Sequence, residues 1–179
     1  TVVYLEPLAL ALSRIACQPV HMVMPRTDLF RATGPTSGAN MVIKIGATND
    51  GMITAGEAVL KFQAGAYAGS PVQPGAMCAF APYDLENVKV VGYDVVTNRP
   101  KVAAYRAPGA PISGYAVESL VDELAKKLDI DPVELRLKNA AKEGTRAAYG
   151  PKFGPVGLVE TLNAIKDTDH YKAKLGPNQ

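Results

Sequence analysis

The sequence predicts an α+β fold of mixed strands with helices packed on the sheet. Two β-rich runs, residues 41–47 and 52–62, flank Thr48-Asn49-Asp50-Gly51, and Asp-Gly between such runs is typical of a hairpin. The valine-rich residues 88–97 predict a third strand. From Val117 onward, apolar residues recur at helical spacing instead. Strands and helices are segregated along the chain rather than alternating, which favours α+β over α/β.

The first third of the chain and the stretch after the hairpin predict shorter elements. Residues 5–16 predict a helix with Pro7 in its first turn, and residues 20–24 alternate as a short strand. Residues 28–38 predict a loop punctuated by Gly34-Pro35. Residues 64–87 have little periodicity, so we expect a long loop that lies against other parts of a larger protein.

The second half of the chain predicts one further strand and three helices. Residues 101–105 form a short strand, and apolar spacing predicts a helix over residues 117–128. Asp131 is expected to cap a new helix that has Pro132 at its first position and runs to about Asn139. Residues 158–166 predict the last helix.

The amino-acid composition argues against nucleic-acid binding, a membrane span and an iron–sulfur cluster in this chain. The chain has 179 residues, 47% of them hydrophobic, and a net charge of +2, so it predicts a folded domain with no nucleic-acid footprint. No apolar run approaches the roughly 20 residues of a membrane span. Cys17 and Cys78 are too few for an iron–sulfur cluster, and we expect both to be buried in a protein of the reducing cytoplasm. Both ends look truncated, so residues 1–179 are expected to be a single fragment of a longer subunit.

The most informative segment is residues 105–111, Tyr-Arg-Ala-Pro-Gly-Ala-Pro, which we term the focal loop. Its small residues and prolines would let a ligand approach the backbone. We expect free amides at Arg106, Ala107, Gly109 and Ala110 just before a helix, where an oxyanion or metal-oxo group fits. Two alternatives remain open at this stage: an ordinary strand-to-helix connection, and an Arg106 side chain that braces the loop through carbonyls instead of pairing with an anion.

Other chemistry-bearing side chains have structural explanations. Paired carboxylates fit helix capping and helix electrostatics, both histidines lack further ligands beside them, and both serines lack a neighbouring histidine. The sequence therefore predicts no catalytic and no metal-ligating side chain among Asp122, Glu123, Asp131, Glu134, His21, His170, Ser37 and Ser113.

Several segments together resemble the xanthine dehydrogenase and aldehyde oxidase family. Ala104-Tyr105-Arg106-Ala107-Pro108-Gly109-Ala110-Pro111 is similar to its Ala-Phe/Tyr-Arg-Gly-x-Gly-x-Pro segment. Asp131-Pro132-Val133-Glu134-Leu135-Arg136-Leu137-Lys138-Asn139 follows its Asp-Pro-x-Glu-Leu-Arg-x-Lys-Asn pattern. Pro19-Val20-His21-Met22-Val23-Met24-Pro25-Arg26 resembles its Arg-Pro-Val-Lys-x-x-x-x-Arg run. The resemblance covers nearly the whole chain.

This resemblance implies part of the molybdenum-binding region of a molybdenum hydroxylase large subunit. It implies a molybdenum cofactor, a molybdopterin expected as a dinucleotide, and oxidative hydroxylation of a small-molecule substrate with oxygen derived from water. Iron–sulfur clusters and FAD would then belong to partner chains, an iron–sulfur subunit and an FAD subunit. Arg106 and Ala107 occupy the family's cofactor-contacting positions.

Departures from the family pattern narrow the expected substrate to an aldehyde or an aromatic N-heterocycle. Thr36 and Pro108 match the substrate-binding positions, where purine-oxidising members have an arginine and a phenylalanine. Threonine lacks the guanidinium charge and proline lacks an aromatic face, so xanthine is an unfavourable substrate. Ala107 replaces the cysteine of copper-containing carbon monoxide oxidation.

Two family segments have no counterpart in the chain. The catalytic glutamate lies in a C-terminal Gly-x-Gly-Glu-like segment, and the pterin is held by a glycine-rich segment and a glutamine. The chain by itself is therefore expected to be inactive. The alternative hypothesis is a non-catalytic scaffold or assembly module of the same architecture.

Overall fold

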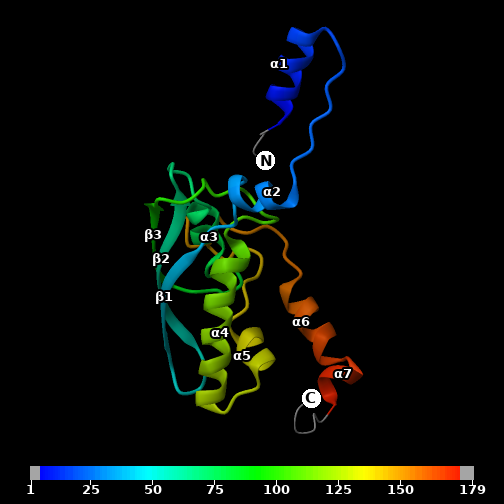
Figure 1. Cartoon of the computed structure of the whole chain (residues 1–179). Helices are drawn as coiled ribbons and strands as arrows, with labels where there is room; N and C mark the ends of the chain where they lie inside the picture. Colours follow the sequence, from blue (N-terminus) through cyan, green and yellow to red (C-terminus); the bar gives the residue numbers. More distant parts are fainter. Residues whose placement is uncertain (1–4, 174–179) are drawn as a thin grey trace.

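The computed structural model describes residues 5–173 and shows a mixed three-stranded sheet. The strands are β1 (Ala39–Ala47), β2 (Ile53–Gly65) and β3 (Asn87–Val96), in the order β1-β2-β3. β1 and β2 are antiparallel, whereas β2 and β3 are parallel. Helices cover one face of this sheet (Figure 1). The predicted α+β fold is confirmed.

The hairpin between β1 and β2 forms where the Asp-Gly pair predicts it. The amide of Thr48 donates to the carbonyl of Met52 over 2.9 Å, and the amide of Gly51 donates to the carbonyl of Thr48 over 2.9 Å. Gly51 has a φ of 89°, and a Cβ there would lie 2.7 Å from Ile130 Cδ1. Glycine is therefore required both by the turn and by the close packing beneath it.

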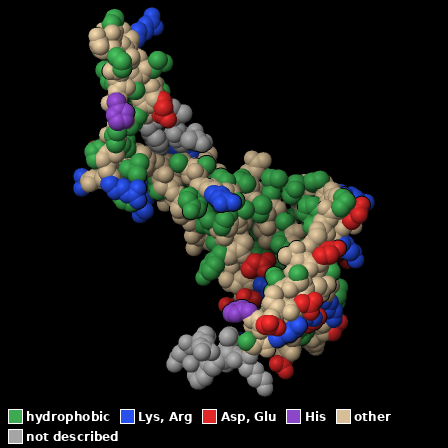
Figure 2. All heavy atoms as spheres, turned by 90° about the vertical axis from the view of Figure 1, so that its right-hand side faces the viewer, with side chains coloured by type: hydrophobic (Ala, Val, Ile, Leu, Met, Phe, Trp, Pro, Cys, Tyr) green, Lys and Arg blue, Asp and Glu red, His purple; other side chains and the backbone are tan. Residues whose placement is uncertain are grey.

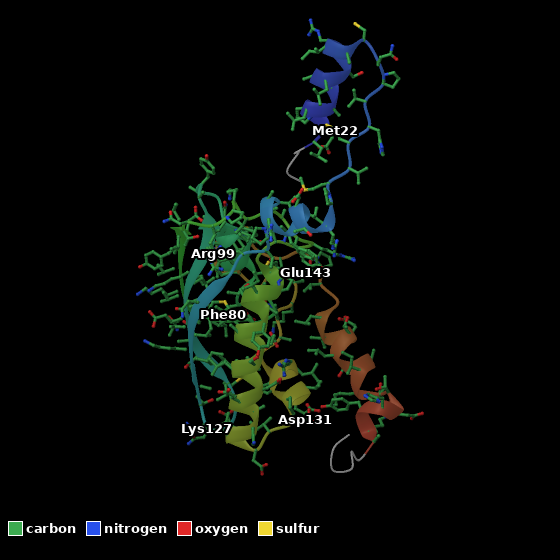
Figure 3. The ribbon with its side chains drawn as sticks, viewed as in Figure 1. Met22, Phe80, Arg99, Lys127, Asp131 and Glu143 are labelled. Atoms are coloured by element: carbon green, nitrogen blue, oxygen red, sulfur yellow. The ribbon has the colours of Figure 1, made fainter. Side chains whose placement is uncertain are left out.

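The core lies between the sheet and the helices α3 (Val72–Cys78) and α4 (Ala110–Leu128). Phe80, labelled in Figure 3, comes from the segment between α3 and β3 and packs into this core. The largest fully buried apolar side chains are Phe62, Leu60, Leu135, Val117 and Val121. Each contributes roughly 1.5–3 kcal/mol by leaving water.

The last three helices form a layer beyond α4. Asp131 caps α5 (Pro132–Lys138), accepting from the amides of Val133 at 2.9 Å and Glu134 at 3.0 Å, as the sequence predicts. α6 (Leu158–Lys166) and the short α7 (Asp169–Lys172) follow on the side of α5 away from the sheet (Figure 1). The hydroxyl of Tyr171 donates to the Asp131 carboxylate and holds α7 against the cap.

The N-terminal arm, residues 5–25, projects away from the body (Figures 1 and 2). Its helix, α1 (Glu6–Ala16), is the predicted one. The strand expected over residues 20–24 is wrong: this stretch, with Met22 labelled in Figure 3, is extended but pairs with no strand. An alternating pattern without a neighbouring strand cannot form a ladder. The loop expected over residues 28–38 is partly wrong, because α2 (Arg26–Ala32) occupies its start.

The long loop expected over residues 64–87 is also wrong. α3 forms within it, and Ala79, Phe80 and Tyr83 are buried in the core of this chain rather than awaiting another part of a larger protein. Pro74 and Gly75 obscure the helix in the sequence, although proline is tolerated in a first helical turn. Each of the other predicted helices is present, and α4 begins earlier than expected, at Ala110.

Residues 101–105 do not form the predicted strand, and the cysteines differ from expectation. The segment is not assigned to a strand, and among residues 5–173 two backbone hydrogen bonds join it to neighbouring segments. Cys17 is exposed rather than buried and adopts a left-handed conformation with φ of 52° at the end of α1; Cys78 is partly buried. Among the described residues, no helix is both long and apolar enough to span a membrane.

Candidate functional site

The focal loop begins where three segments lie side by side. The amide of Val102 donates to the carbonyl of Ala64 at the end of β2 over 3.0 Å. The next amide, that of Ala103, donates to the carbonyl of Pro35 over 3.0 Å. These two bonds fix the backbone immediately before Tyr105, so that the loop emerges from the rigid end of the sheet.

Two residues of the loop have positive φ. Ala107 has φ of 53° and Gly109 has φ of 83°. The left-handed region is costly for alanine, so the surrounding structure holds the backbone there. The amide of Ala110, which follows Gly109, donates to the carbonyl of Ala107 over 3.2 Å. The expectation of a free amide is therefore wrong at Ala110, because that amide closes the turn.

Three loop amides have no protein acceptor among residues 5–173: those of Arg106, Ala107 and Gly109. Arg106 and Ala107 are exposed, whereas Gly109 is buried. The loop leads directly into the 19-residue α4, whose N-cap, Gly109, provides no side-chain cap. Unpaired amides beside the positive end of a helix dipole favour an oxygen atom that carries negative charge. The donor set therefore fits an oxygen ligand of an anionic or metal-centred group.

The Arg106 side chain does not brace the loop. It is exposed, and within the described residues it makes no hydrogen bond and no ion pair. The guanidinium thus stands beside the amides as an uncommitted positive charge with five donors. Of the two roles considered from the sequence, bracing through carbonyls is not seen.

Thr36 lies in the segment that runs beside the start of the loop. Its neighbour Pro35 accepts from Ala103, and its other neighbour, the buried Ser37, donates from Oγ to the carbonyl of Gln63 over 2.7 Å. These anchors fix the Thr36 backbone at the same end of the sheet as the focal loop, with the residue exposed. Pro108 is half-buried within the loop.

One contributor to this site has no clear sequence signal. α3 packs against the loop at Gly109, with Gly75 buried at the contact. The Pro-Gly pair at Pro74 and Gly75 is typical of a turn, which is why the sequence predicts a loop there. The apolar residues Ala79 and Phe80 just after it are the sequence hint that the stretch folds inward, and both are buried.

The residues that carry the family resemblance around α5 are structural. Arg136 reaches Glu118 with Nε and a terminal nitrogen, each at 2.8 Å, and Asp122 at 2.7 Å. The Tyr83 hydroxyl donates to both Glu118 oxygens at 2.9 Å. Burial, reinforced by the Glu118 charge, raises the pKa of Tyr83, so this hydroxyl acts as a donor and not as a base. The cluster ties α4 and α5 to the segment before β3.

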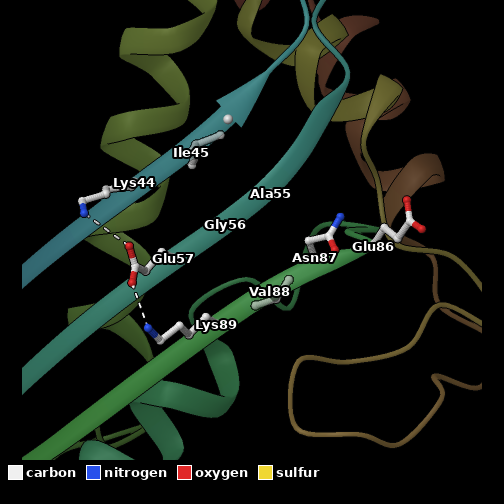
Figure 4. A pocket seen from close by; sticks show the side chains of 10 residues that line it. Lys44, Ile45, Ala55, Gly56, Glu57, Glu86, Asn87, Val88 and Lys89 are labelled. Carbon is white, nitrogen blue, oxygen red and sulfur yellow. Dashed lines mark ion pairs between the residues drawn. The ribbon is translucent and has the colours of Figure 1, made fainter.

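A shallow hollow of about 550 Å³ on the outer face of the sheet is a second candidate (Figure 4). Toward one end of it, Glu57 pairs with Lys44 on β1 at 3.3 Å and with Lys89 on β3 at 3.4 Å. Lys44 first, and then Lys89, lower the pKa of Glu57. The three side chains form a cross-strand charge ladder. Glu86 also lines the hollow and is exposed without a described partner, but no described nucleophilic or metal-ligating group lies with it, so the hollow is the weaker candidate.

Of the four acidic side chains considered from the sequence, Glu123 is exposed and the other three are engaged in local structure. Asp122 pairs with Arg136, Asp131 caps α5, and Glu134 pairs with Lys166. Both histidines are exposed. Within the part of the chain that the structure describes, no three His, Cys, Asp or Glu side chains gather as a metal site. The focal loop, with backbone donors rather than side-chain ligands, is therefore the best candidate site.

Comparisons with known proteins identify relatives over most of the chain. A family model described as the molybdopterin cofactor-binding domain matches residues 1–140. The nicotinate dehydrogenase large molybdopterin subunit of Eubacterium barkeri is 32% identical over 154 residues, 84% of this chain and 36% of that protein. The xanthine dehydrogenase molybdenum-binding subunit of Escherichia coli O157:H7 is 32% identical over 162 residues, 88% of this chain and 22% of that protein.

A solved structure has the same fold. The aldehyde oxidoreductase from Desulfovibrio gigas superposes with a TM-score of 0.84 and 30% sequence identity, covering 92% of this chain and 18% of that one. The chain thus spans 36% or less of the length of these relatives.

Proposed function

The chain belongs to the molybdopterin cofactor-binding domain family, within the xanthine dehydrogenase and aldehyde oxidase group, and we propose that it forms part of the large subunit of a molybdenum hydroxylase. In this proposal residues 1–179 are one segment of the cofactor-binding region. The whole subunit oxidatively hydroxylates an aldehyde or an aromatic N-heterocycle with oxygen derived from water. Electrons leave through an iron–sulfur subunit and an FAD subunit. The cofactor supplies the redox chemistry when it is bound.

The proposal assigns the focal loop to the cofactor. The amides of Arg106 and Ala107 would donate to an oxygen ligand of the molybdenum centre, while Thr36 and Pro108 would line the substrate side. The observation that carries this assignment is that the amides of Arg106 and Ala107 have no described acceptor, while the Ala107 backbone is held at positive φ. Backbone held in a conformation that is costly for alanine, away from the C-terminal end of a helix, is typical of a functional site.

The experiment that tests the proposal is Arg106→Ala in the intact enzyme complex. The variant keeps the backbone amide, and the Arg106 side chain supports no other described residue, so fold and molybdenum content are expected to be retained. Loss of the positive charge beside the site is expected to lower turnover about tenfold, equivalent to ~1.4 kcal/mol. The matched control is Arg99→Ala, which removes another exposed arginine without a described side-chain partner. Equal turnover in the two variants would contradict a site at this loop.

The substrate class is tested by assaying the intact complex with aldehydes, aromatic N-heterocycles and xanthine. We expect turnover with a member of the first two classes and none with xanthine. Threonine at position 36 and proline at position 108 offer neither the charge nor the aromatic face that favours a purine. Rapid xanthine turnover would contradict the assignment of these two residues.

A scaffold role is the second candidate, and the N-terminal arm favours it. Leu8, Leu10 and Ile15 of α1 are exposed by 54%, 73% and 81%. Such an apolar helix surface is typical of an assembly contact. The two candidates are distinguished in the purified complex. If the chain is a scaffold, the complex binds no molybdenum, and Arg106→Ala leaves every measured property of the complex unchanged.

A further inference from the structure

The focal loop and α3 touch through two glycines. A Cβ on the buried Gly75 would lie 3.1 Å from Phe62 Cζ and 3.3 Å from the carbonyl oxygen of Gly109. A Cβ on Gly109 would lie 2.2 Å from the carbonyl oxygen of Pro71 and 2.7 Å from the Gly75 nitrogen. The two backbones are therefore in direct contact, at a distance that only glycine allows.

Gly109 is also held from the α4 side. Its carbonyl accepts from the amide of Ser113 at 3.0 Å and from Ser113 Oγ at 3.2 Å. Ser113 is completely buried, so these bonds do not exchange with water. Gly109 is thus clamped between α3 and the first turn of α4.

Only Pro108 separates this clamp from Ala107. The proline ring fixes its own φ, so the link between Gly109 and Ala107 has little freedom. A displacement of Gly109 must therefore rotate the peptide units whose amides are unpartnered, those of Arg106 and Ala107. The contact with α3 is coupled mechanically to the direction in which these amides point.

We propose that Gly75 is a positioning residue of the site, and that its missing side chain lets α3 set the direction of the Arg106 and Ala107 amides toward the molybdenum cofactor. The inference rests on the proposed function for the identity of the ligand, the molybdenum cofactor. The coupling between α3 and the focal loop concerns this chain alone. A methyl group at position 75 must displace either Phe62 or Gly109 by a few tenths of an ångström. Phe62 is completely buried, whereas the loop beyond Gly109 is exposed, so the loop moves.

The test is Gly75→Ala in the holoenzyme, with Gly56→Ala as the matched control. A Cβ at Gly56 would lie 2.9 Å from the Phe80 ring, so the control also presses on a buried phenylalanine. It does so near the start of β2, away from the end that supports the loop. Both variants are expected to lower the melting temperature by similar amounts.

Of these two variants, Gly75→Ala is expected to change the site and Gly56→Ala is not. Gly75→Ala should retain molybdenum, lower kcat about tenfold, and alter the electron paramagnetic resonance spectrum of the partly reduced enzyme. In the holoenzyme, where the cofactor would accept from the amides of Arg106 and Ala107 and protect them, Gly75→Ala should also speed their hydrogen exchange severalfold. Ser113→Ala, which removes one bond to Gly109 without a steric clash, should change the spectrum and the exchange in the same direction by less.

Identical spectra and exchange rates in Gly75→Ala and Gly56→Ala would overturn the proposal. If Gly75→Ala does not fold, Ser113→Ala decides, and an unchanged spectrum and exchange rate there overturns it as well. A wild-type complex without molybdenum would contradict the proposed function. In that case, shifted NMR resonances of the Arg106 and Ala107 amides in the Gly75→Ala chain, but not in the Gly56→Ala chain, would still support the positioning role, and unshifted resonances would remove it.

Discussion

The side-chain amide of Asn139 donates to the carbonyl oxygen of Gly51 over 2.8 Å, joining the end of α5 to the turn of the hairpin. The same side chain accepts from the amide of Ile53 at 2.8 Å and donates to the carbonyl of Leu135 at 2.8 Å. Asn139 is only 3% exposed. One side chain therefore satisfies three buried backbone groups, and the last residue of the Asp-Pro motif fastens the hairpin to the helical layer.

We expect Asn139→Ala to lower the free energy of unfolding by about 3 kcal/mol. Alanine cannot replace the three bonds, and each buried backbone group left unpaired costs about 1–3 kcal/mol, partly recovered by relaxation. Urea unfolding of the chain measures the loss. Asn163→Ala, on the exposed surface of α6, is the control and should change the stability by less than about 0.5 kcal/mol. Equal stabilities of the two variants would show that Asn139 does not fasten the hairpin.

The stability of the fold is expected to fall even when Arg136 is replaced by lysine. Its side chain is 18% exposed and contacts Glu118 and Asp122 together. Arg136→Lys keeps the charge but not the fork, so we expect a loss of about 1–2 kcal/mol. Arg136→Met leaves Glu118 without its cation and should cost about 3 kcal/mol. Calorimetry or urea unfolding ranks the two, with the exposed Lys127→Met as a near-neutral control. A methionine variant as stable as the wild type would contradict this ranking.

The elements with strong local chemistry were predictable from the sequence. Asp50-Gly51 determines a hairpin turn and Asp131-Pro132 determines a helix start, because the bonds involved lie within a few residues. α3 was not predictable, since Pro74-Gly75 is typical of a turn and the helix depends on packing against Phe62. Alternation at residues 20–24 was misleading because a strand needs a partner, which sequence periodicity does not supply.

The candidate site was predictable in place but not in detail. The small residues of the focal loop indicate a close backbone approach. Alanine at position 107 does not by itself indicate a positive φ, although the glycine that the family pattern has at this position is typical of one. The bond between Ala110 and Ala107 follows from that unusual turn. The position of Thr36 beside the loop depends on the long-range bonds of its neighbours, from Ala103 to Pro35 and from Ser37 to Gln63, which only the fold reveals.

The ion pair between Lys138 and Asp50 predicts a pH dependence of stability. The hydrogen bond from Lys138, followed by that from Thr48, lowers the pKa of Asp50 from its usual value near 3.8 to about 2. A lowered carboxyl pKa stabilises the fold above the unfolded-state value, and this contribution disappears as the pH falls through the folded-state value. We therefore expect the stability difference between wild type and Asp50→Asn to be constant above about pH 4 and to vanish near pH 2.

Urea midpoints measured from pH 7 to pH 2 test this window. Asp84→Asn is the control, because the Asp84 side chain is exposed and makes no hydrogen bond or ion pair with another described residue. The difference in stability between Asp84→Asn and the wild type should be small at every pH. A stability difference for Asp50→Asn that persists undiminished at pH 2 would show that the ion pair does not cause it.

Ala107 offers a test of whether strain is stored at the candidate site. Its φ of 53° disfavours alanine by about 1–2 kcal/mol, whereas glycine adopts it freely but loses about 0.5–1 kcal/mol through its flexible unfolded state. We expect Ala107→Gly to stabilise the chain by about 0.5–1 kcal/mol. Gly114→Ala is the opposite exchange within α4, where a Cβ meets nothing within 4 Å, and it should stabilise by a similar amount through helix propensity. Stabilisation by Gly114→Ala together with destabilisation by Ala107→Gly would contradict this prediction. It would mean that residue 107 leaves the left-handed region in solution. The unpartnered amides would then lose the geometry on which the cofactor assignment depends.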